Sequence, residues 1–170
     1  MESRAKLLGH PVHQMLIVFP LGLLGMAVVF DAIRLVTGSG DLGVASFYMI
    51  AAGVVSGLVA AVFGLVDWWA IPSGTRARAV GRWHAVGNVV VILLFAGSWW
   101  LRLVDRASPP ALAVVLAVAG AGLSLATAWL GGELVDRLGV GVDDGAHLDA
   151  PSSLSGRPAR EPASLASRRS

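Results

Sequence analysis

Four long apolar stretches constrain this chain more than any other feature of its sequence. They cover residues 12–36, 44–71, 84–104 and 111–130. Each has about the 20 residues that a helix rising 1.5 Å per residue needs to cross the ~30 Å hydrocarbon core of a bilayer. Membrane-barrel strands would alternate in polarity, and these stretches do not. The sequence therefore predicts transmembrane helices, which satisfy their own backbone hydrogen bonds in lipid.

The composition agrees with this prediction. The chain is 55% hydrophobic and 14% charged, whereas a soluble domain has about 25% charged residues. A formal net charge of +2 is too small to indicate a nucleic-acid partner. Because there is no cysteine, disulfides and thiolate catalysis are excluded. We expect an integral membrane protein whose main partner is the lipid bilayer.

The connections between the stretches are short, which favours antiparallel neighbours. We therefore expect an all-α, up-down-up-down four-helix bundle over residues 1–142. Residues 143–170 are rich in Ser, Pro, Ala and Arg. Such a segment cannot bury enough apolar surface to order itself, so it is predicted to be a disordered cytoplasmic tail.

Basic residues flanking the stretches are more numerous on the side of the two termini. That side carries Arg4, Lys6, Arg76, Arg78, Arg82 and Arg137. The other side carries Arg34, Arg102 and Arg106. The positive-inside rule then predicts a multi-pass protein of the bacterial cytoplasmic (inner) membrane with both termini in the cytoplasm.

This topology places six polar residues from four segments in one layer on the cytoplasmic side. They are His10, His13, Asp67, His84, Asn88 and Glu133. Ionisable groups within membrane spans are costly and usually face the bundle interior, where they pair. The layer is therefore the candidate functional site.

Histidines on different helices at one depth suggest two kinds of cofactor site. The first is haem b, with His13 and His84 as axial ligands. The second is a transition-metal site, whose ligands would be His10, His13, His84, Asp67 and Glu133. In either case Asn88 would orient a ligand from the second shell. Proton handling is a third use, because imidazole titrates near neutral pH.

The same layer has a purely structural interpretation. His84 and Asn88 are one turn apart on one helix face. Together with Asp67 they could form a buried hydrogen-bond network that fixes helix register. The protein would then be a non-enzymatic structural or assembly subunit of a membrane complex. No catalytic residue is assigned, since no nucleophile elbow, P-loop or dinucleotide motif occurs.

Two further expectations concern the first stretch. Asp31 is expected to pair locally with Arg34, three residues further along the helix. Pro20 has no N–H, so the carbonyl of Leu16 loses its helical donor and the helix is expected to kink there.

Several motifs in chain order resemble a known family of bacterial four-helix membrane proteins. They are His10-Pro11-Val12-His13, Phe19-Pro20-Leu21-Gly22, Gly64-Leu65-Val66-Asp67-Trp68, His84-Ala85 with Asn88, and Gly131-Gly132-Glu133. This pattern is similar to the family called domain of unknown function 2231. The resemblance implies a membrane location, four helices and a shared site.

The chain departs from the family pattern at a few positions. Gln14 stands where relatives often repeat proline, and Asp136 and Leu138 stand where they often have tyrosine and histidine. The histidine-bearing helices of some relatives are similar to those of membrane cytochromes. By analogy, the expected partners are a membrane redox protein or further copies of this chain.

Overall fold

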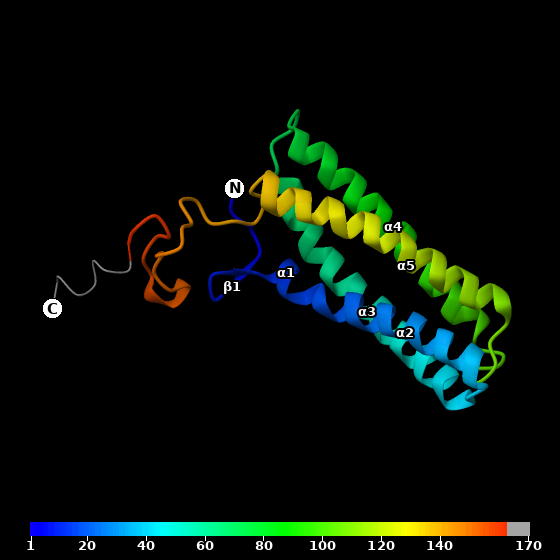
Figure 1. Cartoon of the computed structure of the whole chain (residues 1–170). Coiled ribbons are helices and arrows are strands. Elements are labelled where there is room, and N and C mark those ends of the chain that lie inside the picture. The colour runs from blue at the N-terminus through cyan, green and yellow to red at the C-terminus, as the bar shows by residue number, and fades with distance from the viewer. Residues whose placement is uncertain (163–170) are drawn as a thin grey trace.

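The computed structural model describes residues 1–162 and is built almost entirely from helices (Figure 1). The five α-helices are α1 Val12–Leu16, α2 Val18–Thr37, α3 Gly40–Ala70, α4 Arg76–Leu101 and α5 Ala111–Gly132. Taking α1 with α2, and α5 with the π-helical turn η1 Glu133–Arg137 that extends it, gives four helices long and apolar enough to cross a membrane within the described residues. The prediction of an all-α protein with four spans is confirmed.

Successive long helices run in opposite directions and form a bundle (Figure 1). Helices α2 and α3 pack closely as one hairpin and α4 and α5 as another, while α3–α4 and α2–α5 contacts join the two. The N-terminus, the α3–α4 connection and the end of α5 lie at one end, which we call the terminal end. The α2–α3 and α4–α5 connections lie at the opposite, far end.

Two helices begin earlier than hydropathy predicts. Helix α3 begins at Gly40 rather than at residue 44, and α4 begins at Arg76 rather than at residue 84. Thr75 caps α4 by accepting a hydrogen bond from the backbone N–H of Arg78 at 3.1 Å. The charged first turns of α4 are therefore helical, and His84 lies about two turns inside the helix rather than at its start.

The first span is interrupted where proline predicts it. Helix α1 ends at Leu16 and α2 begins at Val18, with Ile17 between them. Pro20 cannot donate to the carbonyl of Leu16, which leaves a gap in the helical ladder. His13 lies in the short α1, on the N-terminal side of this interruption.

Small residues allow the helices to approach closely. A Cβ at Gly53 would lie 2.6 Å from a Leu24 methyl carbon, and one at Gly57 would lie 2.7 Å from a methyl carbon of Ile92. The core buries Leu24, Ile50 and Phe95 between the helices. Close backbone approach supplies packing where lipid gives little hydrophobic drive.

The segment before α1 folds back over the terminal end. It contains a small antiparallel hairpin of β1 Lys6–Leu7 and β2 His10–Pro11. The turn places Leu8 and Gly9 at positive φ, of 51° and 84°, as a two-residue hairpin turn requires.

The predicted tail follows η1. Residues 143–162 form turns and one short 3-10 helix, η2 Ser153–Ser155, which lies against the hairpin: a Cβ at Gly9 would be 2.7 Å from that of Ser153. The remaining part of the predicted tail, residues 163–170, lies outside the described residues.

Candidate functional site

His13 is held against α3 by a hydrogen bond to the main chain. Its Nδ1 lies 2.8 Å from the carbonyl oxygen of Ala60. Because a carbonyl only accepts, Nδ1 carries the proton, and Nε2 of the neutral ring keeps its lone pair. The ring fits because Gly64 faces it: a Cβ there would lie 2.8 Å from His13 Cε1. Within residues 1–162, Nε2 of His13 has no hydrogen-bond partner.

His84 is held against α5 in the same way. Its Nδ1 lies 2.8 Å from the carbonyl oxygen of Thr127, so this ring also presents Nε2 as the acceptor. Asn88 Nδ2 lies 3.1 Å from that Nε2 and 2.9 Å from the carbonyl oxygen of His84. The Thr127 hydroxyl donates to Asn88 Oδ1 at 3.1 Å. The side chains of His84 and Asn88 on α4 and of Thr127 on α5 therefore form a closed hydrogen-bond network. Asp67, which was expected in this network, binds Ser3 instead.

The helices that carry the two histidines share one neighbour, because α1 and α4 both pack against α3. A Cβ at Gly131 would lie 3.1 Å from His84 Cε1, so this ring too lies beside a glycine. Each imidazole is fixed by one carbonyl and one glycine of a neighbouring helix.

Asp67 has a different environment, because its carboxylate binds the N-terminal segment. The Ser3 hydroxyl lies 2.8 Å from both carboxylate oxygens, and the backbone N–H of Arg4 donates to Oδ1 at 2.7 Å. The backbone N–H of Ala5 adds a longer bond of 3.3 Å. A carboxylate that accepts several N–H and O–H bonds is well satisfied as an anion. Asp67 thus anchors the segment that covers the terminal end.

Glu133 and His10 also lie at the terminal end with partners of their own. Glu133 forms an ion pair with Arg76 at the start of α4. His10 lies on β2, is exposed, and has Nδ1 3.3 Å from the carbonyl oxygen of Leu8. Both residues lie at the terminal end, but their side chains are divided among separate interactions. Within residues 1–162, no three His, Cys, Asp or Glu side chains form a group able to hold a metal ion.

The family model described as "Predicted membrane protein (DUF2231)" matches residues 9–144. The chain belongs to this family. Neither the curated proteins nor the solved structures give a match. All six residues of the predicted layer, His10 included, lie in the part that this DUF2231 member shares with its family.

The far end of this DUF2231 protein contains a buried ion pair that the sequence interpretation missed. Asp31 does not pair with Arg34 as expected; it accepts two parallel hydrogen bonds from Arg102, one of them at 2.8 Å. Arg102 is 0% exposed and Asp31 1%. Ser98 and Ser46 complete the guanidinium shell at 3.2 and 3.3 Å. A bidentate pair at full burial prevails over the local pair because it satisfies both charges.

The two serines extend this pair to the remaining helices. Ser46 of α3 donates to the carbonyl oxygen of Ala27 in α2 at 3.1 Å. Ser98 of α4 donates to the carbonyl oxygen of Ala113 in α5 at 2.6 Å. One polar cluster therefore joins all four helices of the DUF2231 bundle. Asp31 lies inside an apolar span and Arg102 directly follows another. A charge of each sign at the same end of two apolar spans is the sequence signal that could have paired them.

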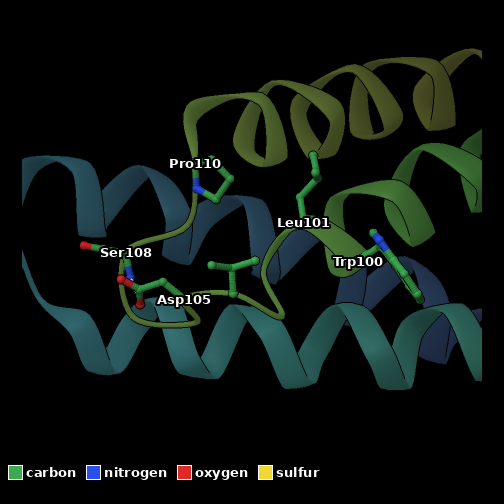
Figure 2. A pocket seen from close by; sticks show the side chains of 6 residues that line it. Trp100, Leu101, Asp105, Ser108 and Pro110 are labelled. Atoms are coloured by element: carbon green, nitrogen blue, oxygen red, sulfur yellow. The ribbon is translucent and has the colours of Figure 1, made fainter.

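A shallow pocket of about 390 Å³ lies beside this cluster, at the α4–α5 connection (Figure 2). Trp100 and Leu101 line it from α4, and Pro110 lines it from the start of α5. Its carboxylate, Asp105, accepts hydrogen bonds from the backbone N–H groups of Ala107 and Ser108 at 3.0 and 2.9 Å. The carboxylate therefore stabilises the turn.

Outside the spans, Lys6 links the N-terminal segment to the region after η1. Its ammonium forms ion pairs with Asp143 and Glu2. The hydrogen bond to Asp143, and then that to Glu2, raise the pKa of Lys6. The hydrogen bond from Lys6 lowers the pKa of Glu2. Both shifts favour the charged forms, so these ion pairs help to hold the segment in place.

Proposed function

We propose that this membrane protein binds haem b through His13 and His84 and takes part in electron transfer. One observation carries the proposal. Each histidine donates Nδ1–H to a carbonyl of a neighbouring helix, at 2.8 Å in both cases. This arrangement fixes the ring and leaves Nε2 as the ligating atom, which is how proteins commonly orient metal-binding imidazoles.

The donor set favours haem over a metal held by protein side chains alone. Asp67 is bonded to the N-terminal segment and Glu133 to Arg76, which leaves two histidines where a non-haem metal would need more ligands. Haem supplies its own four nitrogen ligands and would need only these two imidazoles. When bound, it would supply one-electron redox chemistry.

The environments of the two Nε2 atoms fit this role. His13 Nε2 has no hydrogen-bond partner within the described residues. His84 Nε2 accepts a hydrogen bond from the Asn88 amide. The same amide also donates to the carbonyl oxygen of His84 at 2.9 Å. The amide would therefore keep a partner if the imidazole became a ligand. The proposal places the protein in the bacterial cytoplasmic membrane, termini inside, with a membrane redox protein or another copy as partner.

The test is an absorption spectrum of the full chain purified in mild detergent, together with haem and metal analysis. We expect a Soret band with one haem per chain, lost in His13→Ala and in His84→Ala. His147→Ala is the matched control, because His147 is exposed and outside the spans. A wild-type protein with neither a Soret band nor stoichiometric metal would refute the proposal.

The second candidate function is a structural or assembly subunit. The observation that favours it is the closed network of His84, Asn88 and Thr127, which joins α4 to α5. Under this alternative, His84→Ala lowers the thermal stability and changes no bound cofactor, because none is present. The spectrum and the melting curve of one variant therefore distinguish the two functions.

A further inference from the structure

A second feature of the far end is a groove between α2 and α5. Its volume is about 550 Å³, and it is lined chiefly by apolar side chains. The lining residues that matter here are Arg34, Leu35, Val114, Val115, Val118 and Ala119. The groove exists because α2 packs much less closely against α5 than against α3. Val115 and Val118 are more than half exposed, so the groove is open to the surroundings of the bundle.

The two ends of the groove differ in polarity. Arg34 lies in the last turn of α2 and Ala111 begins α5, and both helix ends lie at the far end of the bundle (Figure 1). From Ala111 to Ala119 the lining descends along α5 by about 12 Å, at 1.5 Å per residue. A cation therefore lies at the mouth, near the end of the span, and apolar side chains line the deeper part.

Arg34 has no counter-charge within residues 1–162. The nearest carboxylate along its helix, Asp31, is bonded to Arg102. The Nε of Arg34 is buried and has no hydrogen-bond partner among the described residues. A buried donor of a charged group is costly without an acceptor. At a membrane boundary the abundant anionic acceptor is the phosphate of a lipid, which guanidinium binds well.

We propose that this groove binds an anionic phospholipid, with its phosphate on Arg34 and an acyl chain along Val115, Val118 and Ala119. The charge selects the headgroup and the groove accommodates the chain. A zwitterionic lipid binds less well, because its ammonium group would lie near the guanidinium. The site is at the opposite end of the bundle from the histidines and is independent of the proposed haem.

The test is native mass spectrometry of the full chain in detergent, with added phosphatidylglycerol or phosphatidylcholine of identical acyl chains. We expect one phosphatidylglycerol to be retained preferentially. Arg34→Ala should weaken its binding about tenfold, the loss expected for one charge-assisted hydrogen-bonded pair. Ala119→Phe, which fills the deeper groove and keeps the charge, should weaken it as well.

Arg82→Ala is the matched control, because Arg82 is exposed on α4 near the terminal end. This variant removes the same charge and should retain the lipid as wild type does. Equal retention in Arg34→Ala and Arg82→Ala would overturn the proposal, as would equal retention of the two lipids by wild type. A loss of dimers in Arg34→Ala with unchanged lipid binding would assign the groove to a second copy of the chain and would also overturn it.

Discussion

Removing Asp31 should destabilise the protein more than removing any surface charge. Asp31→Ala leaves the Arg102 guanidinium fully buried, with Ser46 and Ser98 as its only side-chain partners among residues 1–162. Breaking a buried pair by deleting one partner costs about 3–5 kcal/mol, because an uncompensated charge remains. We expect a loss of that size in the free energy of unfolding, since Arg102 is 0% exposed.

The matched control is Glu133→Ala. Glu133 also forms a carboxylate–guanidinium pair, but its partner Arg76 has a side chain that is 61% exposed. Such a pair contributes about 0–1 kcal/mol. Denaturant-induced unfolding in mixed micelles, followed by tryptophan fluorescence, compares the two variants under identical conditions.

A double variant separates the loss of the ion pair from the cost of leaving Arg102 buried and unpaired. Asp31→Leu combined with Arg102→Met removes both charges and keeps apolar volume, so it should recover most of the loss. If Asp31→Ala costs no more than Glu133→Ala, the cluster does not hold the helices together and the reasoning is wrong.

Two further predictions concern the terminal end. Gly64→Ala should lower the free energy of unfolding by about 1–3 kcal/mol through overpacking, because the new Cβ would lie 2.8 Å from an imidazole carbon. The control Gly25→Ala, whose Cβ meets nothing within 4 Å, should change it by less than about 1 kcal/mol. Equal melting temperatures of the two variants would contradict this prediction. The second concerns pH: the lowered pKa of Glu2 gives stability that is present above its ordinary value of 4.5 and is lost as pH falls through the lowered pKa. The raised pKa of Lys6 gives stability that is present below 10.5 and is lost as pH rises through the raised pKa. The anisotropy of a fluorophore on the hairpin turn should therefore be highest between these limits and lower throughout in Lys6→Met, and a flat wild-type profile would contradict the linkage.

The four spans were predictable because lipid imposes a simple rule on length and polarity. The start of α4 was not, since hydropathy ends a helix where the charged residues begin. A helix can extend beyond the bilayer as long as its backbone N–H and C=O groups have hydrogen-bond partners. Thr75 supplies such a partner at the start of α4. The threonine three residues before Arg78 was a capping signal that hydropathy alone ignores.

The end of the bundle at which the candidate residues lie was predictable from the connections, but their hydrogen-bond partners were not. Topology placed Asp67 and His13 near the same end of the bundle, and the His13 ring lies against Gly64, one turn before Asp67 on α3. Topology gives no rotation about a helix axis, so the binding of Asp67 to Ser3 could not be foreseen. The local pairing of Asp31 with Arg34 was wrong for a related reason: spacing along one helix says nothing of a better partner 71 residues away.

The buried pair of Asp31 and Arg102 also has a consequence for how the protein is made. Asp31 enters the membrane with the first span, whereas Arg102 emerges at the end of the third. Until that moment the first hairpin holds an unmatched acid, which is costly in a bilayer. The spans therefore cannot reach their final packing one after another during synthesis. The first two helices can reach their final packing only after residue 102 has been synthesised, when Arg102 forms the ion pair with Asp31.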